Sequence, residues 1–174
     1  EDVGRVCLES LFTDPEDNNK AVKIFNTNTA GGIVGAFNCS YDENEDIIVN
    51  ENVKPSDIVG FNNGDFAVYQ FSNGNLMHGK PSKSIEVKLK EYEFDLFTVV
   101  PISNGFAPVG ITGKYNPGGF IKEYNQLSDD LVSLKLLEGG EFIAYSEEEP
   151  AEVLVNSKSV DFDYSKNNLK IEVP

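Results

Sequence analysis

Acidic side chains are the most abundant groups in this 174-residue chain that could carry out chemistry. The sequence holds 29 Asp and Glu, which gather at residues 14–17, 42–46 and 147–149. Two carboxylates about 5–10 Å apart across a sugar are what a glycosidase needs, and grouped carboxylates can bind calcium. Segment 42–46 lacks the alternating ligands, central glycine and distal glutamate of the usual calcium loop. Because close pairs are expected by chance among so many acids, we interpret these segments as solvated loops and keep a calcium-stabilised extracellular β-domain as an alternative.

The other reactive side chains are few. His78 is the only histidine in the sequence, and a nucleophile usually needs such a base beside it. Cys7 and Cys39 stand in apolar, strand-like segments and match no zinc-ligand spacing with the acids. We therefore predict a structural or exposed histidine, two buried free thiols, and no catalytic, metal-binding or cofactor-binding residue. Asn38-Cys39-Ser40 matches the glycosylation pattern, but it follows an apolar run and we interpret the match as coincidence.

A glycine pair at Gly31-Gly32 faintly resembles a phosphate-binding loop. Such loops open a helix whose N-terminal amides bind the anion, whereas residues 33–37 have the composition of a strand. We predict a tight turn that leads into a strand.

Aromatic side chains could stack on sugar faces, since the chain has 12 Phe and 7 Tyr but no Trp. Most of them occupy strand positions where core packing is expected. The examples expected inside are Phe37, Phe66, Phe97 and Phe162. An autonomous carbohydrate-binding module is the alternative, and it would need an exposed, flat platform built from Tyr41, Tyr69 or Tyr115.

The net charge of −15 and a pI near 4.3 oppose binding to phosphate backbones and to anionic lipid. No apolar run approaches the roughly 20 residues that span a bilayer, and the first residues lack the layout of a signal peptide. We predict a soluble protein without nucleic-acid or membrane partners, and the composition favours no particular compartment.

Apolar segments of strand length recur between turn signals, and no segment has a sustained helical period. The most informative stretch is 85–110, in which Ile85, Val87 and Leu89 alternate with charged residues before the run fills with apolar side chains. We expect a long strand, broken once, that passes from the edge of a sheet into its core. The segments expected as strands are 6–12, 21–26, 33–39, 46–49, 65–71, 85–102, 106–112, 120–124, 131–137, 141–145, 152–155, 160–164 and 169–173.

Asn-Gly, Gly-Gly and Asn-Asn pairs between these segments accept positive φ and close hairpins readily. One helical turn is expected at residues 55–58, where Ser56 or Asp57 could cap it. With 40% hydrophobic residues, the chain can bury the core of one domain. The sequence therefore predicts an all-β fold, an antiparallel two-sheet β-sandwich that forms a single domain over residues 1–174.

Nine blocks in order along the chain resemble the C-terminal β-domain of the raffinose synthase and alkaline α-galactosidase family. This family includes the seed imbibition proteins and belongs to the retaining α-galactosidases of glycoside hydrolase family 36. The blocks are Leu11-Phe12-Thr13-Asp14-Pro15, Lys23-Ile24-Phe25-Asn26, 32–39, Gly64-Asp65-Phe66-Ala67-Val68-Tyr69, 89–93, 97–102, Phe106-Ala107-Pro108-Val109-Gly110, Tyr115-Asn116-Pro117-Gly118-Gly119 and 160–164.

This resemblance implies a larger parent enzyme in which a catalytic (β/α)₈ barrel precedes the β-domain. The family's two catalytic aspartates lie in the barrel, and no residue here matches their motifs. The resemblance thus implies a non-catalytic accessory domain of an α-galactosidase or a raffinose-synthase-like galactosyltransferase. Its partner would be the barrel of the same parent chain, contacted through an apolar face, and galactosides would be met only through that barrel.

The chain departs from the family at one loop. Members commonly follow Phe-Asn-Cys with Gln-Gly-Ala-Gly-Trp, whereas residues 40–45 here are Ser-Tyr-Asp-Glu-Asn-Glu. The resemblance makes Asn38, Cys39 and Tyr41 candidates for an interdomain or sugar-contact loop. Since the tryptophan is missing, we do not assign raffinose synthase activity on this ground.

Overall fold

The computed structural model describes the backbone of residues 9–10 and the whole of residues 20–174. The expected strand at 6–12 is therefore described only at its centre, and Cys7 and residues 14–17 lie outside the described residues. The described chain is built from short strands and two single-turn 3-10 helices, which confirms the all-β prediction.

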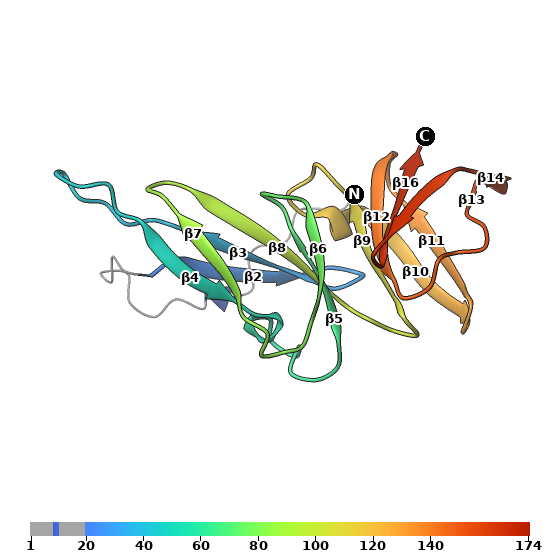
Figure 1. Ribbon diagram of the computed structural model, residues 1–174, viewed down its shortest axis with the longest axis horizontal. Helices are drawn as coiled ribbons and strands as arrows, with labels where there is room; N and C mark the ends of the chain where they lie inside the picture. The colour runs from blue at the N-terminus through green and yellow to red at the C-terminus, as the bar shows by residue number, and fades with distance from the viewer. Residues whose placement is uncertain (1–8, 11–19) are drawn as a thin grey trace.

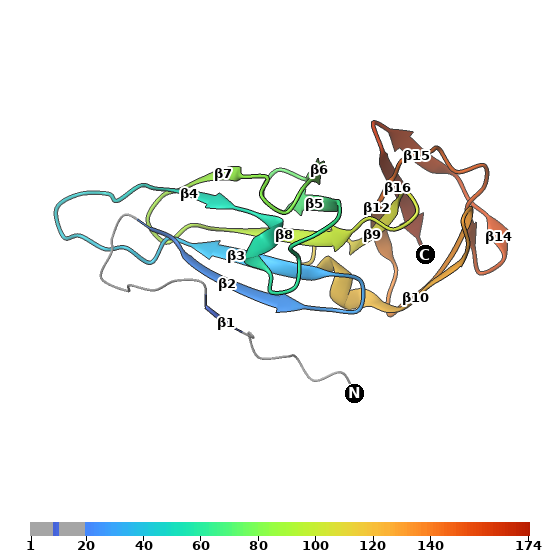
Figure 2. The same ribbon diagram turned by 90° about the horizontal axis from the view of Figure 1, so that it is seen from below.

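The larger sheet has six antiparallel strands. Their order is β1 (Glu9–Ser10), β2 (Val22–Thr27), β3 (Gly32–Phe37), β8 (Phe94–Pro101), β5 (Phe66–Gln70) and β6 (Asn75–Gly79). A separate antiparallel pair, β4 (Val49–Val53) and β7 (Ile85–Leu89), covers one face of this sheet, as Figure 2 shows. Val34, Phe97 and Val53 are 0% exposed in the core between the two layers.

The second sheet has four antiparallel strands and lies at one end of the molecule (Figure 1). Their order is β15 (Phe162–Ser165), β16 (Asn168–Val173), β12 (Gly140–Ser146) and β9 (Phe106–Ile111). Two hairpins accompany it, formed by β10 (Ile121–Ser128) with β11 (Leu131–Leu136) and by β13 (Leu154–Val155) with β14 (Lys158–Ser159). Ile111, Phe142 and Leu169 anchor the core that the sheet shares with β10 and β11.

The two sheets pack face to face through small and aromatic side chains. Ala67 and Val100 of the six-stranded sheet meet Ala107 and Tyr145 of the four-stranded sheet, and all four are buried. Tyr69, Val109 and Ile143 form the neighbouring part of this contact. The structure is thus an antiparallel β-sandwich, as expected, with a two-stranded antiparallel layer on the outer face of each sheet.

The stretch 85–110 contains one break, as predicted, but the idea of one strand running from edge to core is wrong. A turn at residues 90–93, closed by the Glu93 N–H to the Lys90 carbonyl at 3.0 Å, sends β7 and β8 into different layers. The turn separates the alternating half of the stretch from its apolar half. The next connection, at Asn104-Gly105, has positive φ at both residues and forms a tight turn, bridged by Ser103 and Phe106, that leads from β8 into β9 of the other sheet.

Some expected boundaries differ from the structure. The strand expected at 46–49 is β4, which runs from Val49 to Val53 through Asn50, Glu51 and Asn52, residue types with low strand propensity. The sequence analysis also missed β6, β14 and the turn η2 (Pro117–Phe120). The helical turn η1 (Pro55–Asp57) is confirmed, with the Asp57 carboxylate accepting the Lys54 N–H at 3.0 Å.

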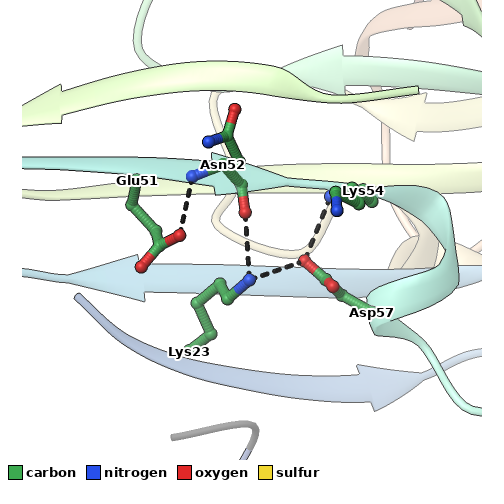
Figure 3. A network of polar contacts seen from close by, with 5 residues as sticks. All are labelled: Lys23, Glu51, Asn52, Lys54 and Asp57. Carbon is green, nitrogen blue, oxygen red and sulfur yellow. Dashed lines mark hydrogen bonds and ion pairs between the residues drawn. The ribbon is translucent and has the colours of Figure 1, made fainter. Parts of the chain in front are cut away.

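A polar network ties the β4–β7 pair to the six-stranded sheet (Figure 3). Lys23 Nζ of β2 donates to the Asn52 carbonyl of β4 at 2.9 Å and to Asp57 Oδ2 at 3.1 Å. The Lys23 and Asp57 side chains are only 16% and 15% exposed. Because each charge has its partner, their attraction offsets part of the cost of desolvating them, and the network links the outer layer to β2.

Candidate functional site

One face of the six-stranded sheet carries no ionisable side chain along β2, β3 and β8. The strand register sets Val22, Phe37 and Phe94 side by side, and places Ile24 and Leu96 on either side of Gly35. This surface points away from the β4–β7 pair, whose contacts are made by the alternate residues. We call it the apolar face, and its members, all half-buried or exposed, are Val22, Ile24, Ile33, Phe37, Phe94 and Leu96.

Four aromatic rings follow one another across this region. The Phe37 and Phe94 rings stack with centroids 5.7 Å apart, and Tyr115 meets Phe94 edge-on at 5.9 Å. Tyr115 also meets Phe71 edge-on at 5.3 Å. Phe94 is 40% exposed and Tyr115 is 64% exposed. We call these four residues the aromatic row.

Local backbone geometry positions the aromatic row. A Cβ at Gly35 would lie 2.6 Å from the Phe37 ring, so glycine leaves room for that ring against the sheet. The loop that carries Tyr115 is joined to the β2–β3 turn, where Asn28 Nδ2 donates to Asn116 Oδ1 at 3.0 Å. Asn28 Oδ1 in turn accepts the N–H of Gly31 at 2.8 Å. The expected tight turn at Gly31-Gly32 is confirmed, and it supports the loop of Tyr115.

A cleft of about 480 Å³ lies near one end of the aromatic row. We call it the β7 cleft. It is lined by the strand segment 86–89, by the turn and strand residues 92–95, and by Gln70 and Ser72 from the end of β5. Phe94 is the one residue that belongs to both the aromatic row and the β7 cleft.

Asp95 is a carboxylate on the cleft wall and is only 2% exposed. Its Oδ2 accepts from Gln70 Nε2 and from Ser72 Oγ, each at 2.7 Å. Its Oδ1 accepts the N–H of Ser72 at 3.1 Å and the N–H of Leu96 at 2.8 Å. Four neutral donors thus satisfy the charge and hold the chain after β5 in place.

The candidate residues Asn38, Cys39 and Tyr41 lie on the loop that follows Phe37. Asn38 is 2% exposed, and its Nδ2 donates to the carbonyls of Ile47 at 2.9 Å and Leu89 at 3.1 Å. Its Oδ1 accepts the N–H of Ser40 at 3.0 Å. The Asn38 amide therefore closes the loop onto β7, which supports the interpretation of the glycosylation pattern as coincidence.

The prediction of a buried Cys39 is wrong, because this thiol is exposed. Strand β3 ends at Phe37, and the neighbouring Asn38 and Ser40 are the residues of the loop that are buried. Tyr41 is 59% exposed. A contact role for Asn38, Cys39 and Tyr41 stays a prediction, with the outward positions held by Cys39 and Tyr41.

The remaining sequence candidates to be placed are His78 and the acidic loop 42–46. His78 is exposed, as expected, with Nε2 3.3 Å from Asp65 Oδ1. In the acidic loop 42–46 the Asn44 N–H donates to Asp42 Oδ1 at 2.8 Å. Within the described residues, no group of three or more His, Cys, Asp or Glu side chains could hold a metal ion.

Several aromatic residues were assigned to the core or to a surface platform by sequence. Phe66 and Phe97 are buried as expected, whereas Phe37 is half-buried because its strand position turns it to the apolar face. Phe162 is half-buried against the core of the four-stranded sheet.

Tyr69 cannot join a surface platform, because it is 6% exposed. Burial raises the pKa of its phenol, and nearby Glu141 raises this pKa further. Phe71 and Phe94 were missed, because their place beside Tyr115 depends on contacts between distant segments.

Comparison with known proteins connects this arrangement to one family. The family model described as "Raffinose synthase or seed imbibition protein Sip1" matches residues 2–173. The chain is 30% identical over 193 residues to probable galactinol–sucrose galactosyltransferase 6 of Arabidopsis thaliana, covering 95% of the chain and 26% of that protein. It is 30% identical over 197 residues to galactinol–sucrose galactosyltransferase of Pisum sativum, covering 95% and 24%. Stachyose synthase of Pisum sativum is 29% identical over 198 residues, covering 95% and 23%.

The chain spans about a quarter of the length of these curated relatives. Among the described residues, no helix is long and apolar enough to cross a membrane. The family model covers nearly all of the sequence, and the β-sandwich agrees with the domain that the motifs resemble. The chain therefore belongs to the raffinose synthase and seed imbibition protein family and corresponds to the C-terminal β-domain of its members.

Proposed function

We propose that residues 1–174 form the non-catalytic accessory domain of a galactosyl-transferring enzyme and dock through the apolar face onto the catalytic barrel of the same parent chain. The apolar face is the observation that carries this proposal. Although 25% of the residues are charged, the outward rows of β2, β3 and β8 contain no charge and expose Phe94, with the exposed Tyr115 of a neighbouring loop beside it. Aromatic side chains and a lack of charge characterise the centres of protein interfaces.

The length of the relatives beyond the matched region supports this choice of partner. About three quarters of each relative lies outside it, as the coverages of 26%, 24% and 23% imply. A stable interface buries about 800 Å² on each side, which a three-stranded face and its flanking loops can supply. We expect the β-domain to stabilise the barrel and to keep the apolar face dry.

The reaction class is proposed from the names of the relatives, which are galactosyltransferases and a stachyose synthase. A retaining enzyme forms a glycosyl-enzyme intermediate that is attacked either by a sugar hydroxyl or by water. Transfer to a sugar is the proposed outcome here, and hydrolysis by an α-galactosidase is the alternative. Whether a sugar hydroxyl or water attacks the intermediate is decided in the barrel, so the β-domain supplies no group to the reaction.

The test compares variants in the full-length gene product and in the 174-residue chain. Phe94→Lys places a charge on the apolar face at its most exposed phenylalanine, so we expect the full-length protein to lose thermal stability and galactosyl transfer from galactinol to sucrose. The 174-residue chain with the same change should lose much less thermal stability than the full-length protein, because Phe94 is 40% exposed. Leu131→Lys is the matched control, since Leu131 is 55% exposed on β11 and lies outside the apolar face.

Two results would overturn the proposal. If full-length Phe94→Lys behaves like Leu131→Lys, the apolar face is not the docking surface. If the 174-residue chain alone transfers galactose, the domain is catalytic.

A further inference from the structure

We propose that the β7 cleft binds a neutral saccharide. The cleft lies between β7, the turn at residues 90–93 and the end of β5, and its volume of about 480 Å³ is in the range of small-molecule sites. The choice of raffinose, melibiose and sucrose as probes rests on the proposed function, whereas the cleft itself is described by its own residues.

The charges around the cleft select the class of ligand. The residues that line the cleft include three carboxylates, Glu86, Glu93 and Asp95, and one ammonium, that of Lys88. Anions are disfavoured by this excess, and the described carboxylates are not grouped as a metal site requires. The polar side chains that surround the cleft oppose an apolar ligand. A neutral ligand with many hydroxyl groups, which both donate and accept hydrogen bonds, suits this mixture of groups.

The polar wall of the cleft is held in position before any ligand arrives. Besides its bond to Asp95, Gln70 Nε2 lies 3.3 Å from Ser72 Oγ, and Gln70 Oε1 accepts from Asn73 Nδ2 at 2.9 Å. Asp95 already accepts four hydrogen bonds, so it is a positioning residue that orients Gln70 and Ser72. Side chains that are already ordered reduce the entropic cost of binding.

Tyr92 gives an independent indication of a ligand. It is 71% exposed and has φ of 61° at the third position of the turn closed by Glu93 and Lys90. Glycine or asparagine favours this left-handed conformation, and a bulky side chain is strained in it. Strained residues of this kind cluster at binding sites. Tyr92 is one of the residues that line the cleft, where its exposed ring can stack on the C–H face of a sugar.

The test is a titration of the 174-residue chain with raffinose, melibiose and sucrose, followed by amide NMR shifts. We expect saturable shifts at Gln70, Ser72 and Tyr92 with at least one of these sugars. Tyr92→Asn removes the ring at a position that asparagine tolerates, and we expect it to keep the fold and weaken binding roughly tenfold. Tyr115→Ala is the matched control, because Tyr115 is 64% exposed and does not line the cleft.

The outcomes separate the two proposals. Unchanged affinity in Tyr92→Asn, or no saturable shift with any of the three sugars, overturns the cleft proposal and leaves docking through the apolar face intact. Loss of sugar binding in Tyr115→Ala together with full binding in Tyr92→Asn would move the saccharide to the aromatic row. If Phe94→Lys leaves the full-length protein unaffected while sugars bind at Tyr92, docking fails and the cleft stands.

Discussion

The two faces of the six-stranded sheet use the same three strands in opposite ways. On the covered face, Val34 and Phe97 are 0% exposed under the β4–β7 pair, and the polar residues Lys23 and Asp95 are each hydrogen-bonded. On the apolar face, charges are absent and Phe37 and Phe94 remain partly exposed. The comparison indicates that the fold completes one face by itself, where polar groups are tolerated because they have partners. The other face is covered by the four-stranded sheet only along β5 and the end of β8, and along β2, β3 and β8 it keeps the apolar side chains on which the docking proposal rests.

Phe97 and Phe94 provide the largest test of this difference, since the same residue type stands on opposite faces of β8. We expect Phe97→Ala to lower the free energy of unfolding by about 3–5 kcal/mol, because it leaves a cavity in a closed core. Phe94→Ala should cost about 1 kcal/mol in the 174-residue chain. Urea denaturation of the two variants measures both values. Equal losses would mean that the fold buries the two faces to the same degree.

The ion pair between Lys23 and Asp57 on the covered face gives the next largest effect on the free energy of unfolding. Asp57→Ala leaves the Lys23 ammonium without its carboxylate and removes the acceptor of the Lys54 N–H, so we expect a loss of about 2–3 kcal/mol. The control is Glu123→Ala in the pair of Lys135 and Glu123, whose side chains are 60% and 53% exposed. That change should cost less than about 0.5 kcal/mol. A loss in Asp57→Ala as small as in the control would show that the network of Figure 3 does not hold the β4–β7 pair.

Asp95 tests whether a buried charge on the covered face is stabilised by neutral donors alone. Asparagine has the same shape, but its NH₂ group would face two of the four hydrogen-bond donors in either orientation. We expect Asp95→Asn to cost about 1–2 kcal/mol in thermal unfolding. Asp42→Asn, on an exposed loop, is the control and should be near neutral. A neutral Asp95→Asn would mean that the carboxylate is not needed to order the chain after β5.

The sequence predicted the strands better than it predicted the faces. Alternation predicted the start and the buried side of β7, because Ile85, Val87 and Leu89 are buried while Glu86 and Lys88 are exposed. The Asn104-Gly105 turn was likewise predictable from residue type. Both features are local, so they need no knowledge of a distant partner.

The faces depend on contacts between distant segments. Strand β3 pairs with β8 some sixty residues later, as in the pair of Phe37 and Phe94, and this register decides which aromatic rings turn outward. Phe71 and Tyr115 join the aromatic row from two further segments. Cys39 was misassigned for a related reason, because the buried amide of Asn38 bonds to Ile47 and Leu89 and turns the loop there. Composition and spacing carry no information on these contacts.

Tyr92 gives the smallest expected effect, and it is one that raises stability. Tyr92→Gly relieves a left-handed conformation while increasing the freedom of the unfolded chain, so we expect a net gain of roughly 0.5–1 kcal/mol in urea denaturation. Asn104→Gly is the control: Asn104 has φ of 48°, and asparagine already tolerates this region, so its gain should be smaller. A loss of stability in Tyr92→Gly would mean that the fold uses the ring for packing. A gain would mean that the chain retains a tyrosine that its own fold does not need, as expected for a side chain that contacts a ligand in the β7 cleft.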